Sequence, residues 1–160
     1  FFDGVPECRQ HPGVLGGQPA RQALAPLVVA EHGQVGVGQL NPQSSYHLSF
    51  DLGYPNAFDR AHQRTGSYLM VHGSCVSIGC YAMTDAGIEE IYSLVAAALA
   101  HGQSRVQVHA LPFRFDAGWE RTHGDSPWLD FWRDLAVIDA RFEAERHPPK
   151  VRLAQKRYVL

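Results

Sequence analysis

The sequence predicts a mainly β domain of the α+β class, with two helices packed against its strands. Two patterns predict this class. Short segments alternate apolar and polar residues with a period of two, as strands do. Two longer segments repeat apolar residues every three or four positions, as helices do. Apolar residues make up 45% of the 160 residues, which suffices for one domain with one core.

Charge and cysteine content exclude several classes of protein. A net charge of −2 gives no electrostatic reason to expect a nucleic acid or an acidic membrane as partner. No apolar run approaches the ~20 residues that a membrane-spanning helix needs. The three cysteines are too few, and odd in number, for a disulfide framework. At least one thiol is therefore expected to be free or to bridge another chain.

Segment 1–38 is expected to be an atypical arm that precedes the folded domain 39–160. Four prolines interrupt it, and it shows no sustained helical or strand period. Only residues 26–30 favour a strand within it. Its composition resembles an out-of-frame translation of GC-rich coding DNA, so the arm is interpreted as disordered or frame-shifted.

The first half of the domain is predicted to form two strands. Segment 45–52 alternates, with Tyr46, Leu48, Phe50 and Leu52 facing the core and His47, Ser49 and Asp51 facing solvent. Residues 53–56 form a turn, and segment 57–66 holds a short helical turn. Segment 67–72 then predicts a buried strand that ends at His72.

The second half is predicted to contain two helices and two strands. Thr84 or Asp85 caps a helix that runs to about His101, with Gly102 at the position that follows the helix. Segment 105–110 predicts a strand. Ser126 and Pro127 suit the first positions of the second helix, which ends before residue 148. The tail 151–160 predicts a final strand.

The stretch HGSCVSIGCYAM, residues 72–83, carries the strongest chemical signal. A thiol attacks as its thiolate, and a free cysteine with a pKa of ~8.5 is mostly protonated at neutral pH. A nearby imidazole can accept the proton, so His72 and Cys80 form a candidate base and nucleophile. Gly79 permits a sharp turn at which the amides of Gly79 and Cys80 would stabilise an oxyanion.

This stretch resembles the signature of the YkuD-type L,D-transpeptidase catalytic domain, in its YafK-like branch. The resemblance is carried by V-H-G-x-C-V-S-I-G-C-Y-A-M and by flanking segments, among them QLNPQSSYHLSFDLGYPNAFDR, TDAGIEEIYSLV, VHALPFRF and SPWLDFWRDL. It covers roughly residues 39–160. Many family members carry histidine where this chain has Ile78, whereas the YafK-like branch has an apolar residue there.

The resemblance implies an L,D-transpeptidase-like β-sandwich that acts as a cysteine acyl-transferase or amidase on peptidoglycan stem peptides. Cys80 would be the nucleophile and His72 the base, oriented by the backbone carbonyl of Gly73. An amine of another stem or of a peptidoglycan-linked lipoprotein, or water, would resolve the acyl-enzyme. No cofactor is implied. The expected location is the periplasm or cell envelope, and roles in the cell wall and cell shape follow.

Four further residues are substrate-binding candidates, and two other functions stay open. Ser77 precedes the Gly-Cys pair, where family members keep Ser or Thr. Tyr54 and Asn56 belong to a segment that resembles one near the family's cleft, and Arg114 would face an anionic stem peptide. One alternative is an inactive peptidoglycan-binding remnant, because the family's G-D-x-x-T-P-E-G stretch is missing from segment 1–38. The other is a small zinc-binding domain built from His47, His72, Cys75 and Cys80.

Overall fold

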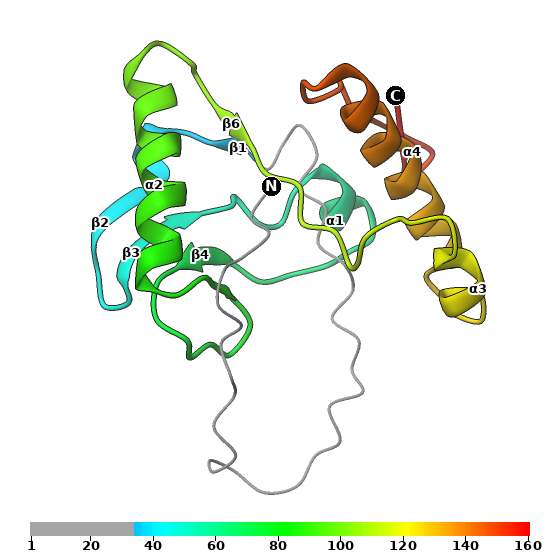
Figure 1. The fold of residues 1–160 in the computed structure, drawn as a ribbon, viewed down its shortest axis with the longest axis horizontal. Coiled ribbons are helices and arrows are strands. Elements are labelled where there is room, and N and C mark those ends of the chain that lie inside the picture. Colours follow the sequence, from blue (N-terminus) through cyan, green and yellow to red (C-terminus); the bar gives the residue numbers. More distant parts are fainter. Residues whose placement is uncertain (1–33) are drawn as a thin grey trace, which may run out of the picture. The chain divides into compact units, whose positions relative to one another are not determined.

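The computed structural model describes residues 34–160, which form two compact units (Figure 1). Unit 1 comprises Gln34–Tyr54 and Gly66–Val106, and unit 2 comprises Pro55–Thr65 and Gln107–Leu160. Strands and helices occur together, so the α+β class is confirmed. The strand predicted at 26–30 and most of the predicted arm lie outside the described residues. Within residues 34–160, no helix combines the length and the hydropathy that a membrane span requires.

Unit 1 contains a four-stranded sheet in the order β2-β3-β4-β5. Its strands are β2 (Leu40–Ser44), β3 (His47–Asp51), β4 (Met70–His72) and β5 (Tyr81–Ala82). The first three pair antiparallel, and β5 runs parallel to β4. Parallel neighbours usually need a crossover of a dozen or more residues. Here residues 73–80 suffice, because the strands are short and both Ser74 (φ 61°) and Gly79 (φ 153°) adopt positive φ.

Helix α2 (Asp85–Ala100) packs against β3 and β4 and buries Ile88, Val95 and Leu99. It begins as predicted, because the Thr84 hydroxyl accepts a hydrogen bond from the Gly87 amide at 3.1 Å. Gly102 follows its end with φ 93°. Next to the sheet, β1 (Gln34–Val35) pairs with β6 (Val106–Gln107), and the 3-10 helix η1 (Val37–Gln39) follows β1.

Segment 45–52 departs from its predicted pattern at two positions: Tyr46, expected to face the core, is 47% exposed in the turn before β3, and Ser49 is buried. Phe50 and Leu52 are buried, as the alternation predicts. Ser49, however, was expected to face solvent and is only 1% exposed. The prediction is wrong at this residue because β3 is an interior strand whose two faces are both covered at this point. An alternation with a period of two indicates that one face of a strand is apolar. It cannot show that the opposite face is also buried.

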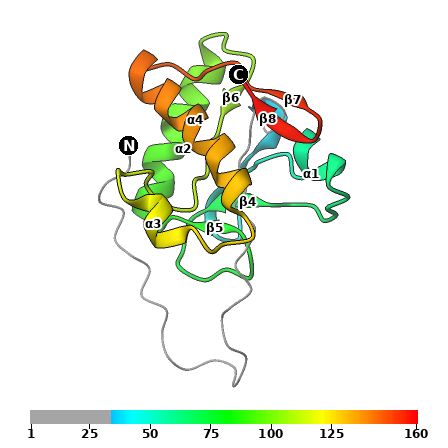
Figure 2. The ribbon, with the colours of Figure 1, turned by 90° about the vertical axis from the view of Figure 1, so that its right-hand side faces the viewer.

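Unit 2 gathers its core around helix α4 (Leu129–Glu145) and a C-terminal hairpin, drawn in red in Figure 2. The hairpin consists of β7 (Arg152–Ala154) and β8 (Arg157–Val159). The core also includes Phe58 from α1 (Ala57–Ala61), whose ring stacks on that of Tyr158 with 4.6 Å between the centroids. The buried core residues are Phe58, Trp132, Leu135, Ile138, Val151 and Tyr158.

Three parts of unit 2 differ from the prediction. The tail forms a hairpin instead of a single strand, because Gln155 (φ 48°) and Lys156 (φ 60°) both turn in the left-handed region. A short helix, α3 (Trp119–His123), was not predicted. Helix α4 starts at Leu129, two residues later than expected, and the Ser126 hydroxyl accepts a hydrogen bond from the Trp128 amide at 3.2 Å.

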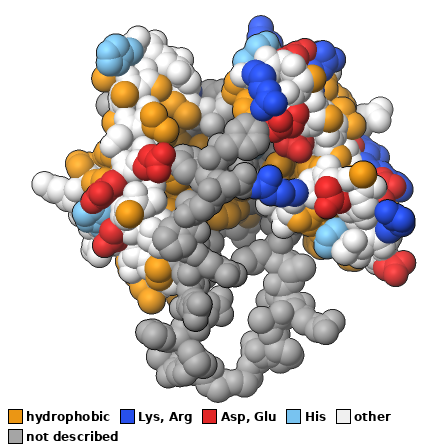
Figure 3. All heavy atoms as spheres, viewed as in Figure 1, with side chains coloured by type: hydrophobic (Ala, Val, Ile, Leu, Met, Phe, Trp, Pro, Cys, Tyr) orange, Lys and Arg blue, Asp and Glu red, His pale blue; other side chains and the backbone are white. Residues whose placement is uncertain are grey.

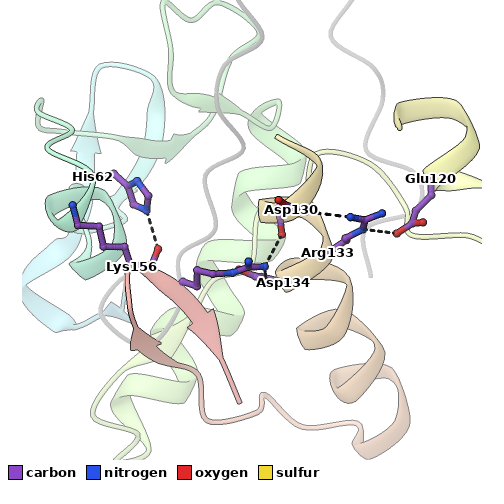
Figure 4. A network of polar contacts seen from close by, with 7 residues as sticks. His62, Glu120, Asp130, Arg133, Asp134 and Lys156 are labelled. Atoms are coloured by element: carbon purple, nitrogen blue, oxygen red, sulfur yellow. Dashed lines mark hydrogen bonds and ion pairs between the residues drawn. The ribbon is translucent and has the colours of Figure 1, made fainter. Parts of the chain in front are cut away.

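The exposed side of unit 2 is organised by ion pairs. Figure 3 shows acidic and basic side chains intermixed over α3 and α4. Arg133 bonds both Glu120 of α3 and Asp130, and Arg157 of β8 bonds Asp134 at 2.6 Å (Figure 4). The contacts join α3, α4 and the hairpin. Exposed pairs of this kind contribute ~0–1 kcal/mol each, so they orient these elements more than they stabilise them.

Candidate active site

The register of β4 and β5 places His72 and Cys80 on one face of the sheet. Val71 pairs with Tyr81, and His72 pairs with Ala82. Cys80, one residue before β5, is therefore level with Met70. Because side chains alternate between faces along a strand, Cys80 and Ala82 point to the same side as His72 and Met70. The parallel return of residues 73–80 thus sets Cys80 two residues before Ala82, the strand partner of His72.

His72 is held in one tautomer by its own loop. The side chain is 3% exposed, and its Nδ1 lies 2.6 Å from the carbonyl oxygen of Gly73. A carbonyl can only accept a hydrogen bond, so Nδ1 carries the proton. In the neutral ring Nε2 then holds the lone pair, which is the arrangement that a general base needs. The ring of Tyr46 covers the imidazole, with 4.8 Å between their centroids.

Cys80 is a free thiol that is neither buried nor fully exposed. Its Sγ lies 3.5 Å from the carbonyl oxygen of Tyr68, to which the thiol donates a weak hydrogen bond. The sulfur therefore lies beside the backbone that leads into β4, consistent with the register. Since Cys80 is free, it forms no disulfide with Cys75.

The turn before Cys80 is organised by the Ser77 hydroxyl. This hydroxyl donates to the Cys80 carbonyl at 2.8 Å and accepts from the Gly79 amide at 3.1 Å. The Gly79 amide is thus engaged within the loop, and it would have to leave Ser77 to bind an oxyanion. Gly79 has φ 153°, and an added Cβ would meet nothing within 4 Å. The glycine therefore leaves open space next to the cysteine.

Gly73 occupies a position where a side chain would collide with its surroundings. A Cβ there would lie 2.6 Å from the Tyr46 carbonyl oxygen and 2.7 Å from Asp85 Oδ1. The same carboxylate oxygen accepts the amide of Ser74 at 2.7 Å. The close approach of three segments, the β2–β3 turn, the loop after β4 and the start of α2, fixes the backbone whose carbonyl holds His72.

The zinc-binding alternative is wrong for the part of the chain that the structure describes. All four predicted ligands lie within residues 34–160, and that region contains no group of three or more His, Cys, Asp and Glu side chains arranged to hold a metal. His47 instead pairs with Glu89 of α2, with Nε2 and Oε1 2.7 Å apart. His72 Nδ1 is taken by Gly73.

The remaining substrate-binding candidates are divided between the units. Tyr54 belongs to unit 1, where its ring lies against Gly66. Asn56 and Arg114 belong to unit 2. Asn56 is buried and caps α1: its side chain accepts the Asp59 amide at 3.0 Å and donates to the Tyr158 hydroxyl at 3.1 Å. These contacts give Asn56 a structural task, and a contact of these three residues with substrate stays a prediction.

Two residues of the site were missed, Tyr46 and Ser49. Both belong to the hairpin of β2 and β3. Ser49 pairs directly with His72 across the antiparallel strands, and Tyr46 contacts the His72 ring. The missing information was the register of segment 45–52 against segment 67–72. An antiparallel pairing that sets Ser49 opposite His72 would have found both.

Comparison with known proteins agrees with the motifs. A scan against protein-family models finds no match. Two curated proteins from Escherichia coli, strains K12 and O157:H7, are each described as "Putative L,D-transpeptidase YafK" and are 48% identical to this chain over 122 residues. The match covers 76% of this chain and 50% of each relative, so the chain spans about half the length of the curated relatives it matches. The resemblance to the YafK-like L,D-transpeptidases is thereby confirmed over these 122 residues.

Proposed function

We propose that this chain carries the catalytic centre of a cysteine acyl-transferase or amidase that acts on peptidoglycan stem peptides in the cell envelope. The observation that supports the proposal is the register of β4 and β5, in which His72, with its tautomer fixed, pairs with Ala82, two residues after the free thiol of Cys80. The similarity to two curated proteins, each described as "Putative L,D-transpeptidase YafK", supports this substrate class. The same centre serves transfer when an amine is the acceptor and hydrolysis when water is.

The first half-reaction follows from the protonation states. His72 Nε2 takes the proton of the Cys80 thiol, and the thiolate attacks the carbonyl carbon of the residue next to the terminal D-residue of the stem. A C–S bond forms as the carbonyl π bond opens to an oxyanion. The Cys80 amide stabilises that oxyanion, joined by the Gly79 amide if it leaves the Ser77 hydroxyl. When the tetrahedral intermediate collapses, the amine departs with the proton from His72 and leaves a thioester.

The second half-reaction reverses these roles. An amine of another stem, an amine of a peptidoglycan-linked lipoprotein, or water attacks the thioester carbonyl and gives its proton to His72. The C–S bond then breaks, and the sulfur regains a proton from the imidazolium. The Gly73 carbonyl keeps its hydrogen bond to Nδ1 throughout, so the ring shuttles a proton only at Nε2.

The proposal is tested by looking for the thioester. The full chain is incubated with a disaccharide–tetrapeptide or with a carbapenem, a reagent that acylates nucleophilic thiols, and is then digested and measured by mass spectrometry. We expect an added mass on the peptide that contains Cys80. Cys80→Ser should abolish it, and His72→Ala should slow its formation by about 100-fold or more.

Two results would reject the catalytic proposal. One is product formation by Cys80→Ser at the wild-type rate. The other is binding of the disaccharide–tetrapeptide with neither reagent ever acylating Cys80, which would support the inactive peptidoglycan-binding remnant instead. His101→Ala, at the end of α2, is a matched control for loss of a histidine, and it should acylate at the wild-type rate.

A further inference from the structure

The hydroxyl of Ser49 is an unexplained polar group next to the candidate base. Ser49 is 1% exposed, and its Oγ has no hydrogen-bond partner among the described residues. A buried hydroxyl without a partner is unfavourable, because folding removes its hydrogen bonds to water and returns none. A buried serine hydroxyl without a hydrogen-bond partner calls for an explanation, and a role in catalysis is one such explanation.

The strand register places this hydroxyl beside the imidazole. Ser49 is the cross-strand partner of His72. The neighbouring pair, Leu48 and Gly73, is joined by a backbone hydrogen bond of 3.1 Å. Hydrogen-bonded and non-hydrogen-bonded pairs alternate in an antiparallel ladder, so Ser49 and His72 form a non-hydrogen-bonded pair. In such pairs the side chains are closest, with Cβ atoms ~4.5–5.5 Å apart.

Two contacts of the His72 ring are already used. Its Nδ1 donates to the Gly73 carbonyl, and its ring contacts Tyr46. When Nε2 receives the thiol proton, the ring becomes an imidazolium with a second N–H donor. The ring is 3% exposed, so this donor has little access to solvent. An acceptor on the same sheet face meets that need, and Ser49 supplies one.

We infer that Ser49 is a positioning residue for His72, whose hydroxyl oxygen accepts a hydrogen bond from the imidazolium Nε2–H formed when Cys80 transfers its proton. This inference rests on the proposed function, since it needs the Cys80–His72 pair. The hydroxyl gives up no proton itself and forms no covalent bond. The hydrogen bond stabilises the Cys80 thiolate and His72 imidazolium pair. It also fixes the orientation of the ring until the proton is transferred to the leaving amine.

The charged groups on the neighbouring elements already have other partners. They remain unchanged when Ser49 is substituted. His47 and Glu89 form an ion pair, and Asp85 accepts the Ser74 amide. On β3, Asp51 accepts the Gly53 amide at 2.7 Å. A change of Ser49 therefore alters the hydrogen bonding of the site without altering its charge.

The experiment measures how fast iodoacetamide alkylates Cys80 between pH 5 and pH 10, resolved by peptide mass spectrometry. Ser49→Thr and Ser49→Val add the same volume to a buried strand position and differ in the hydroxyl alone. We expect Ser49→Thr to stay within about twofold of the wild-type rate at pH 7. Ser49→Val should be about three- to tenfold slower, with the midpoint of its rate profile at higher pH.

Ser49→Ala covers the case in which the larger side chains do not fit. Removing an unpaired buried hydroxyl should leave the melting temperature unchanged or raise it, while alkylation at pH 7 slows as in Ser49→Val. A serine with only a structural role would not give this combination. Ser45→Ala, an exposed serine in the turn of the same hairpin, should match the wild type in both measurements.

The outcomes separate this inference from the proposed function. If His72→Ala alkylates as fast as the wild type, the Cys80–His72 pair itself is wrong, and the inference falls with it. If His72→Ala is slow but Ser49→Ala keeps the wild-type rate and profile, only the role of Ser49 is overturned. Equal rates for Ser49→Thr and Ser49→Val, in folded proteins, would also overturn it.

Discussion

At the residue scale, Gly73 links the packing of unit 1 to the chemistry of the site. Its carbonyl holds His72 Nδ1, and its Cα lies against the Tyr46 carbonyl and the Asp85 carboxylate. A side chain would have to push apart the two groups that press on it. Glycine is needed here because of this close approach, and this requirement explains the glycine of the H-G motif.

Gly73→Ala is therefore expected to lower both stability and thiol reactivity. Displacing the two neighbours should cost about 1–3 kcal/mol in the free energy of unfolding and should misplace the His72 ring. Thermal denaturation and the rate of Cys80 alkylation at pH 7 measure the two effects. Gly38→Ala is the matched control, because an added Cβ there meets nothing within 4 Å. A Gly73→Ala protein that behaves like Gly38→Ala in both measurements would contradict this account.

The sequence indicates the candidate catalytic residues more readily than the residues that surround them. His72, Gly73 and Cys80, the predicted catalytic residues, lie within one short motif, and the pairing of β4 with β5 that brings its two ends together is local in the sequence. Tyr46 and Ser49 reach the site through strand pairing across more than twenty residues. Periodicity assigned Ser49 to solvent, since it describes a strand by itself and not the elements on both of its sides.

At the element scale, helix α4 contains a carboxyl group, that of Asp139, whose ionisation is unfavourable in the folded protein. Burial raises the pKa of Asp139, and the negative charge of Glu143, one turn later, raises it further. A carboxyl group with a raised pKa binds its proton more tightly in the folded state. Its contribution to stability is therefore present below the ordinary value of ~3.9 and is lost as the pH rises through the folded-state pKa.

Asp139→Asn should consequently stabilise the protein at neutral pH and not in acid. We expect a higher melting temperature than the wild type at pH 7 and a smaller difference at pH 3.5, where the wild-type carboxyl, with its pKa raised above the ordinary ~3.9, is mostly protonated. Calorimetry at both pH values measures this. Asp125→Asn, an exposed carboxylate outside α4, should lack the same pH-dependent gain. An Asp139→Asn effect of equal size at both pH values would show that charge is not its cause.

The two long helices were predictable, whereas the short helix α3 and the turn of the C-terminal hairpin were not. Helix α2 has a capping hydroxyl at Thr84 and a glycine after its end, so both boundaries were visible in the sequence. Helix α3 spans five residues, too few to show a helical repeat. The turn of the C-terminal hairpin has Gln155 and Lys156 at positive φ. Turns of this kind usually contain Asn or Gly at these positions, so the sequence did not indicate a turn here.

At the scale of the whole molecule, one half-buried histidine makes stability sensitive to mild acid. Burial lowers the pKa of His109 in unit 2, whose ring lies edge-on to Phe142 at 5.9 Å. Its Nε2 has no hydrogen-bond partner within residues 34–160. The unfolded chain protonates this group first, so stability is present above ~6.5 and declines as the pH falls toward the folded-state pKa.

His109→Phe should flatten this dependence. The wild type is expected to lose unfolding free energy between pH 7 and pH 5, and the variant should lose less, because position 109 then carries no imidazole with a lowered pKa. Urea denaturation at the two pH values gives both slopes. His147→Gln, at a histidine whose side chain is 70% exposed, should keep the wild-type slope. An unchanged slope in His109→Phe would mean that other groups set the pH response.

Unit 2 is assembled from two stretches of chain that synthesis produces far apart in time. The amide of Asn56 bonds Tyr158 across 102 residues, and His62 donates to the Lys156 carbonyl across 94. At ordinary translation rates of about 5–20 residues per second, α1 leaves the ribosome roughly 5–20 s before its hairpin exists. During that interval the Phe58 ring has no hairpin to pack against, and a nascent chain halted there would offer it to chaperones and to proteases.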